Sequence, residues 1–393
     1  MLRAHRRRPE LALALGSILS VVAVLEGAFR LWAWRENRRG FERAMGLSRP
    51  PAPGATVTLG GLIRPSPNPR IVYELWPGMD VFFDDSHSGQ RTRVLTGRAG
   101  FHDRDYAADK RRGVRRIVGI GDSLMFGWGV EQGQDYLSQI EERLNAGGGA
   151  GAWEVINTAV PGYNTAMEVE TLEAKGLAYR PDLVVLGFCA NDASLPNFIL
   201  AQRDVLSLRE SFLVGFVRSR FEPPPGGDAL VHAPRRGDDR AFEDDPSRVP
   251  SAYRPIAGWE AFERSLRRLR DLAPIHGFRI LVVAFSQDGT DERKDRGLRA
   301  AAELGLPVLD FGKAEAAYMR AHGIDAYVGS VLTVSAQDRH PSPLSHGIAA
   351  TELLGWMARE GLVPPPAGPP APADACVPAR AGGTPRSPAA VRR

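Results

Sequence analysis

A serine near position 120 and a histidine near position 340 are the residues best placed to do chemistry. Ser123 stands in a Gly-Asp-Ser-Leu run directly after an apolar stretch, and His340 stands two residues after Asp338. A serine hydroxyl becomes a nucleophile when an imidazole takes its proton, and a carboxylate can hold that imidazole in the required tautomer. The pattern therefore predicts Ser123 as nucleophile, His340 as general base and Asp338 as the acid. The alternative for Ser123 is a helix cap, a common place for serine after a strand.

Two further blocks offer neutral hydrogen-bond donors. Gly162 lies in a Val-Pro-Gly-Tyr-Asn run, where it begins a tight turn whose amide could point into a crevice. Asn191 lies in a Gly-Phe-Cys-Ala-Asn-Asp run and has a side-chain amide. Donors of this kind stabilise the oxyanion of a tetrahedral intermediate, and the backbone N–H of Ser123 at a helix start could add another.

Other polar residues in these blocks are expected to be structural. His346 is the rival general base, but His340 has the nearby carboxylate that a base needs. Asp122 is expected to shape the loop around Ser123 by hydrogen bonding. The other histidines considered are scattered and form no cluster with metal-ligand spacing: His87, His102, His232, His276 and His322. The sequence therefore predicts no metal site.

A parallel sheet would bring these blocks together. From Val114 onward, apolar strands alternate with amphipathic helices, a pattern typical of a parallel sheet with helices on both faces. Because three of the blocks each follow a strand, they should meet at the carboxyl edge of the sheet, where such folds bind ligands. The predicted strands cover residues 116–121, 153–159, 182–189, 279–286 and 307–311.

The start of the chain predicts a membrane helix. Residues 11–25 are uncharged, and counted through Trp34 the apolar stretch reaches the ~20 residues that a spanning helix needs. Trp32 and Trp34 suit the headgroup boundary, and the arginines before the stretch favour a cytoplasmic N-terminus. A cleaved signal peptide is the alternative. Either reading leaves the rest of the chain on the periplasmic or extracellular side, in the first case with a single-pass N-terminal anchor.

Composition divides the chain further and excludes some function classes. Apolar residues make up 43% of the 393 residues, and the net charge of +4 is concentrated at the two ends. No basic stripe interleaved with aromatic residues is present, so a nucleic-acid partner is not predicted. Cys189 and Cys376 are not expected to form a disulfide, since one ends a buried strand and the other lies in a tail.

We predict five segments: an anchor at 1–34, a linker at 35–69, an N-terminal extension that packs on the main domain at 70–113, the main domain at 114–362, and a disordered tail at 363–393. The main domain carries an insertion at 193–254. Its first half, 199–221, is predicted to be helical, and its second half is rich in Pro, Gly and charge. The insertion is either a substrate-selecting lid or a surface decoration.

The four blocks in this order resemble the SGNH hydrolase superfamily, also called GDSL-like lipases and esterases. That family is named for a Ser, a Gly, an Asn and a His in four short blocks, which match Ser123, Gly162, Asn191 and His340 over about residues 114–360. The stretch 96–103 is similar to the segment that precedes the serine block in membrane-anchored bacterial members. One departure concerns the acid: the family usually places it three residues before the histidine, where this chain has Gln337, so we assign Asp338 instead.

The resemblance implies a fold, a site and an activity. The fold would be a flavodoxin-like three-layer α/β/α sandwich with a parallel five-stranded sheet, preceded here by the transmembrane helix. The oxyanion hole would comprise Ser123, Gly162 and Asn191, with no metal and no organic cofactor. The expected activity is that of a serine esterase acting on acyl, including acetyl, esters of glycans or lipids through an acyl-serine. Two alternatives stay open: an O-acyltransferase using a cell-surface glycan as acceptor, and a catalytically silent binding protein with the same fold.

Overall fold

The computed structural model describes residues 7–47, 49–85, 89–146, 153–200, 205–206, 211–219, 230–232, 245, 249–285 and 292–363. At its centre is a five-stranded sheet with the strand order β12-β11-β8-β6-β7. All four strand pairings in it are parallel. The strands are β6 (Arg115–Gly121), β7 (Trp153–Asn157), β8 (Leu183–Phe188), β11 (Arg279–Ala284) and β12 (Val308–Asp310). The predicted α/β fold with five parallel strands is confirmed, and the strand order is that of the flavodoxin-like doubly wound sheet.

Helices cover both faces of the sheet and make it the middle layer of three. One core cluster joins alternate strand residues such as Ile117 and Val185 to α4 (Tyr136–Asn145), α10 (Phe311–His322) and α11 (Pro343–Arg359). The other cluster joins the intervening residues, such as Val118 and Val184, to α8 (Trp259–His276) and α9 (Glu292–Glu303). Helix α5 (Thr165–Ala174) contributes residues to both clusters. Burial on two faces explains why these strands are continuous apolar runs.

The segments before the sheet also pack on this core. They form a three-stranded sheet of β1 (Thr56–Val57), β4 (Asp80–Asp85) and β5 (Gln90–Leu95), and a hairpin of β2 (Ile63–Pro65) and β3 (Tyr73–Leu75). A short helix α2 (Leu59–Leu62) connects β1 to β2. Leu62 is fully buried in the core, so the later part of the predicted linker 35–69 is folded onto the domain. The Tyr73 hydroxyl donates to the Pro161 carbonyl at 3.0 Å, which ties this extension to the turn before Gly162.

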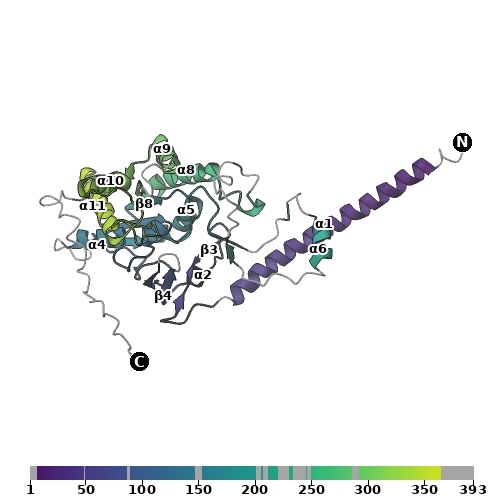
Figure 1. Ribbon diagram of the computed structural model, residues 1–393, viewed down its shortest axis with the longest axis horizontal. Helices are drawn as coiled ribbons and strands as arrows, with labels where there is room; N and C mark the ends of the chain where they lie inside the picture. The colour runs from purple at the N-terminus through teal and green to yellow at the C-terminus, as the bar shows by residue number, and fades with distance from the viewer. Residues whose placement is uncertain are drawn as a thin grey trace, which may run out of the picture.

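The N-terminal helix α1 (Arg7–Leu47) extends well past the predicted end of the anchor and projects from the globular body (Figure 1). Within it, the span Ala12–Asn37 contains an 18-residue window with a mean hydropathy of 2.0, and no residue of that window is buried. It is the one helix in the described part of the chain that is long and apolar enough to cross a membrane, and a signal sequence would meet the same criteria. This helix is therefore a candidate single-pass anchor or signal sequence.

The insertion 193–254 contains less helix than predicted. Residues 199–221 were expected to be helical, but the described part holds a strand, β9 (Phe198–Leu200), and one short helix, α6 (Phe212–Ser219). Strand β9 pairs with β10 (Leu230–His232) in an antiparallel hairpin. The Leu200 amide donates to the Tyr253 hydroxyl at 2.8 Å, which fixes the strand to the domain. Most of the Pro/Gly-rich second half and the predicted tail from residue 364 lie outside the described residues.

Candidate active site

Ser123 is the first residue of α3 (Ser123–Phe126), directly beyond the carboxyl end of β6. The cap of this helix is Asp122, whose side chain accepts a hydrogen bond from the Leu124 amide at 3.0 Å. The capping alternative for Ser123 is therefore wrong, because the neighbouring carboxylate fills that role. The predicted loop-shaping role of Asp122 agrees with this contact, and the serine hydroxyl is left to face other partners.

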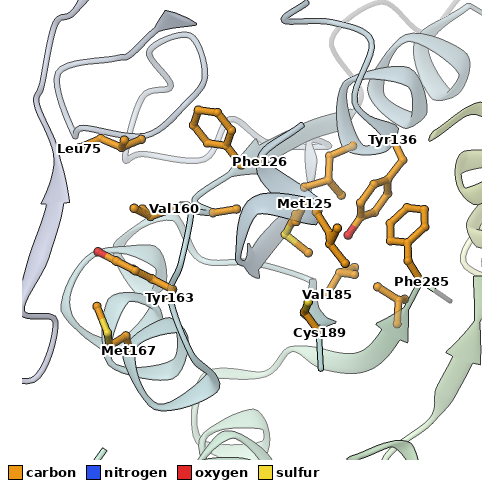
Figure 2. Close-up of a cluster of buried hydrophobic side chains, with 14 of the residues drawn as sticks. Leu75, Met125, Phe126, Tyr136, Val160, Tyr163, Met167, Val185, Cys189 and Phe285 are labelled. Carbon is orange, nitrogen blue, oxygen red and sulfur yellow. The ribbon is translucent and has the colours of Figure 1, made fainter. Parts of the chain in front are cut away.

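Close packing beneath α3 fixes the height of Ser123 above the sheet. A Cβ added to Gly121 would lie 2.8 Å from the Met125 Cβ, and one added to Gly187 would lie 2.8 Å from the Met125 Cε. A larger residue at Gly121 would push α3 away, and one at Gly187 would displace the Met125 side chain. In Figure 2, Met125 lies in the middle of the buried cluster, with Tyr136 to one side and Val160 to the other. The glycines thus let the helix sit directly on the sheet.

Ser123, His340 and Asp338 form a continuous chain of hydrogen bonds. The Ser123 Oγ lies 2.9 Å from the His340 Nε2, and the His340 Nδ1 lies 2.6 Å from the Asp338 Oδ1. The same Asp338 oxygen accepts the backbone N–H of His340 at 2.9 Å, which is possible because the two residues are only two positions apart. In the tautomer that this network favours, Nδ1–H donates to the carboxylate and Nε2 accepts the serine proton. These contacts bring Ser123 together with His340, which lies 217 positions later in the sequence.

Asp338 is held as a carboxylate. Burial raises its pKa, but hydrogen bonds and the charge of His340, together with a hydrogen bond involving Asp85, outweigh burial and lower the pKa to about 2. The loop that carries the two residues is itself fixed, since the Val334 amide donates to the His340 carbonyl at 3.0 Å and the Asp338 amide donates to the Ser335 Oγ at 3.1 Å. An ionised Asp338 can therefore orient His340 and stabilise its protonated form.

Two residues that the sequence analysis did not single out complete this network. The Trp128 ring stacks on His340, with centroids 5.2 Å apart and planes 21° apart. Its Nε1 lies 3.2 Å from the Asp338 Oδ2 and 2.9 Å from the Asp85 Oδ2. Asp85 is buried at the end of β4, so the N-terminal extension reaches the network around Asp338. The Gly-Trp-Gly run that follows the serine block was the one available signal for Trp128.

Replacing Trp128 by phenylalanine is expected to lower kcat/KM about tenfold, because it keeps the stacked ring but removes one hydrogen bond to the Asp338 carboxylate. The measurement is steady-state hydrolysis of p-nitrophenyl acetate. Trp153→Phe is the matched control, since Trp153 lies at the start of β7, away from His340. Equal rates for the Trp128 variant and the unmodified protein would show that the indole N–H has no positioning role.

Gly162 and Asn191 lie in the turns after β7 and β8. Gly162 has a φ of +77°, a conformation that favours glycine, and a Cβ there would lie 2.5 Å from the side chain of Asn197. The backbone N–H of Asn197 donates to the Gly162 carbonyl at 3.0 Å, which fixes the orientation of the turn. The Asn191 Nδ2 lies 3.5 Å from the Tyr163 carbonyl, so the amide side chain reaches the turn that contains Gly162. The two residues therefore belong to adjoining loops.

His346 is part of the core. It is fully buried in α11 and stacks on Tyr136 at 5.9 Å, with Phe285 against its edge. Neither ring nitrogen has a hydrogen-bond partner among the described residues. Burial and then the charge of His340 lower its pKa to about 3. His346 is thus a neutral packing residue, as expected.

Burial of His346 predicts a loss of stability in acid. Below its ordinary pKa of 6.5 the unfolded chain binds a proton at this residue, whereas the folded protein stays neutral there down to about pH 3, so stability falls as pH drops through this range. The free energy of unfolding should fall between pH 7 and pH 5, and in His346→Phe this fall should be smaller by about 2 kcal/mol. Urea unfolding at both pH values measures this. The exposed residue His322 gives the control variant His322→Phe, and an unchanged pH dependence in His346→Phe would contradict the assignment.

Three acidic residues lie buried behind Ser123. Burial raises the pKa of Asp122, Glu168 and Asp192, and charge repulsion within the group raises those of Glu168 and Asp192 further. The Asp192 Oδ2 accepts the Thr165 hydroxyl at 2.8 Å. Among the described residues, no group of three His, Cys, Asp or Glu is placed to hold a metal ion. The contacts of this group are structural ones beneath the loop of Ser123.

The chain matches the model of the GDSL-like Lipase/Acylhydrolase family over residues 120–347, which is more than half of its length. It belongs to this family. The match begins in β6 and ends in α11, so it contains all four blocks on which the SGNH resemblance was based. That resemblance is confirmed, and the GDSL-like enzyme is a serine hydrolase that acts on ester bonds.

The similar solved structures cover about three fifths of this chain. A variant of an acetylxylan esterase from Geobacillus stearothermophilus is 17% identical, with a TM-score of 0.39 and coverage of 61% of this chain and 93% of that one. A second acetyl xylan esterase is 16% identical, with a TM-score of 0.39 and coverage of 61% and 98%. A member of the lipolytic G-D-S-L family from Veillonella parvula is 15% identical, with a TM-score of 0.36 and coverage of 63% and 100%. No curated protein matches this GDSL-like hydrolase.

Proposed function

We propose that this hydrolase is a serine esterase that cleaves acyl esters of glycans or lipids, acetyl esters included, through an acyl-serine formed on Ser123. The observation that carries the proposal is the chain of hydrogen bonds from the Ser123 Oγ through His340 to Asp338, at 2.9 and 2.6 Å. Distances of this size are those of a nucleophile with an oriented general base. His340, with a side chain that is 21% exposed, and the partly exposed Ser123 leave the pair accessible to substrate.

The proposed reaction has two balanced halves. In the first, the Ser123 Oγ attacks the ester carbonyl as its proton passes to the His340 Nε2, and His340 then gives that proton to the leaving alcohol while the C–O bond breaks. In the second, His340 takes a proton from water, the hydroxide attacks the acyl-serine, and the proton returns to Ser123 as the acid leaves. Asp338 stays ionised in both halves and stabilises the imidazolium form of His340.

The oxyanion would be stabilised by the backbone N–H of Ser123, the backbone N–H of Gly162 and the side-chain amide of Asn191. The contact of Asn191 with the carbonyl of Tyr163, the residue after Gly162, supports this assignment. Asn191→Ala is expected to lower kcat about 10²-fold with little change in KM, because the donor acts mainly on charge that develops in the transition state. Steady-state kinetics on p-nitrophenyl acetate measure both constants, and an unchanged kcat would remove Asn191 from the oxyanion hole.

The location proposed for this chemistry is the outer side of a membrane. Helix α1 would serve as a retained single-pass anchor with the catalytic domain in the periplasm or outside the cell. The support is the exposed apolar surface of Ala12–Asn37, with Trp32 and Trp34 near its end. An anchored enzyme in that place would meet esters on surface glycans or on lipids.

A fluorophosphonate probe tests the proposed nucleophile directly. The full-length protein should be labelled at a single serine, and the label should be lost in Ser123→Ala. A panel of acetyl to long-chain esters, run with and without a glycan acceptor, then defines the acyl group and separates hydrolysis from transfer. A correctly folded protein that reacts with neither the probe nor any ester would be a binding protein, and the esterase proposal would be wrong.

A further inference from the structure

Helix α6 of the insertion packs against α1 at a distance from the catalytic core (Figure 1). The rings of Phe29 and Phe216 lie with centroids 4.5 Å apart, and Trp32 meets Phe216 edge-on at 6.1 Å. The Arg30 guanidinium lies over the Phe212 ring, 4.9 Å from its centroid. The two helices thus join along the stretch of α1 between Glu26 and Trp32.

The polar contacts of this junction use two charged residues of the apolar helix. Both carboxylate oxygens of Glu26 accept hydrogen bonds from the start of α6 and the residue before it: the backbone amides of Phe212 and Leu213 donate at 3.0 Å, and the Ser211 hydroxyl donates at 2.8 Å. Arg30 pairs with Glu26 at 2.9 Å and donates to the Val205 carbonyl at 2.7 Å. Charged residues inside a membrane segment are costly unless they are paired. Here they are paired with each other and with the start of α6.

The other side of α6 is also apolar. Val214 is 58% exposed and Val217 is 52% exposed, although the opposite side already packs on α1. A helix that is apolar on both sides is not expected to leave one of them in water. The neighbouring stretch of α1 also has exposed apolar residues, which include Leu25, Leu31 and Trp32. The exposed apolar side chains of α6 are therefore suited to the same apolar medium that would surround α1.

The depth of α6 follows from the length of α1. At ~1.5 Å per residue, the ~20 residues that cross a ~30 Å hydrocarbon layer, counted from Ala12, end close to Leu31. Helix α6 contacts α1 between Glu26 and Trp32, so it lies at the boundary of that layer on the side of the catalytic domain. Interfacial helices bury an apolar face at this depth. The exposed Arg218 in the last turn of α6 would lie among the lipid headgroups.

We infer that α6 is a second membrane-bound element, a helix held on α1 by Glu26 whose Val214 and Val217 side faces lipid acyl chains at the bilayer interface. The inference goes beyond the proposed esterase activity and rests on the proposed membrane position of α1. Strand β9 follows directly from Asn197, which fixes the Gly162 turn, so the insertion links one wall of the candidate site to the membrane surface.

Site-specific fluorescence quenching tests the inference on the full-length protein. Single cysteines are introduced at Val217 and, separately, at Val21 and Ile275, in a chain with Cys376→Ser that retains the buried Cys189. Each is labelled with bimane and reconstituted in phosphatidylcholine–phosphatidylglycerol liposomes, with and without brominated phosphatidylcholine. Ile275 is a matched control, because it is 70% exposed on α8 of the catalytic domain. Hydrolysis of soluble p-nitrophenyl acetate by the same samples reports the esterase activity separately from the quenching. The membrane position of α6 and the esterase activity can therefore fail independently.

Brominated lipid should reduce the fluorescence at Val217 and Val21 at least about twofold and leave Ile275 unchanged, as expected for side chains in the acyl region. Quenching at Val21 without quenching at Val217 would overturn the role of α6, and quenching at neither would overturn the membrane position of both helices. Glu26→Ala, which removes the acceptor for α6, should reduce the quenching at Val217 and not that at Val21. Unchanged quenching at Val217 in Glu26→Ala would show that Glu26 does not hold α6.

Discussion

Replacing Ser123 by alanine is expected to lower kcat at least about 10⁴-fold, because no acyl-serine can then form. The rate that remains would come from the oxyanion donors and from substrate binding. The loss should appear with every ester that the unmodified enzyme cleaves, since all would use the same nucleophile. The loss of kcat is measured in stopped or continuous assays with p-nitrophenyl acetate. The enzyme must be in large excess over contaminating esterases.

The fold of this variant should be intact, which makes the result specific. The Ser123 hydroxyl contacts only the His340 Nε2 and, at 3.4 Å, the Asp122 Oδ2 among the hydrogen bonds of the described residues. The cap of α3 is provided by Asp122, so alanine at position 123 leaves the helix start unchanged. The melting temperature should therefore change by no more than about 2 °C. A variant that melts normally and still cleaves esters at the original rate would disprove the assignment of the nucleophile.

The central sheet could be predicted closely from the sequence because its strands are buried on both faces. A strand such as β8 must be apolar at every position, and the run from Leu183 to Phe188 is unlike any surface segment. The predicted strand before Ser123 ends at Gly121, as β6 does, whereas the other four predicted strands extend one or two residues past the observed carboxyl ends. After β7 and β8, these extra residues are the positions where the chain leaves the sheet to form the loops of Gly162 and Asn191.

The acid network was harder to predict because it depends on contacts between distant segments. Asp85 reaches Trp128 only because β4 packs against the catalytic domain, and no local pattern encodes that contact. The length of α6 was overestimated for a related reason. An apolar stretch in the insertion favours a helix by composition. The pairing of β9 with β10 instead depends on a contact between two separate segments, which no local pattern signals. The partner of α6 is α1, which lies some 180 positions earlier.

Replacing Asp338 by asparagine is expected to lower kcat by about 10³- to 10⁴-fold while the protein stays folded. The reason is that one carboxylate oxygen of Asp338 accepts from both the His340 Nδ1 and the His340 backbone N–H, and the other oxygen accepts from the Trp128 Nε1. An amide provides only one acceptor atom. If its NH₂ faces His340, the ring is driven to the tautomer that cannot take the serine proton, and if it faces Trp128, two donors oppose each other.

A second variant separates these two orientations. With Trp128→Phe in place, the amide NH₂ no longer meets an opposing donor on that side, and its oxygen can accept from His340. The double variant Asp338→Asn with Trp128→Phe should therefore be more active than Asp338→Asn alone, although each single change lowers activity, a coupling that a double-mutant cycle on kcat/KM detects. Additive losses would mean that the indole and the carboxylate act independently. In that case Trp128 would contribute to catalysis only by stacking on His340.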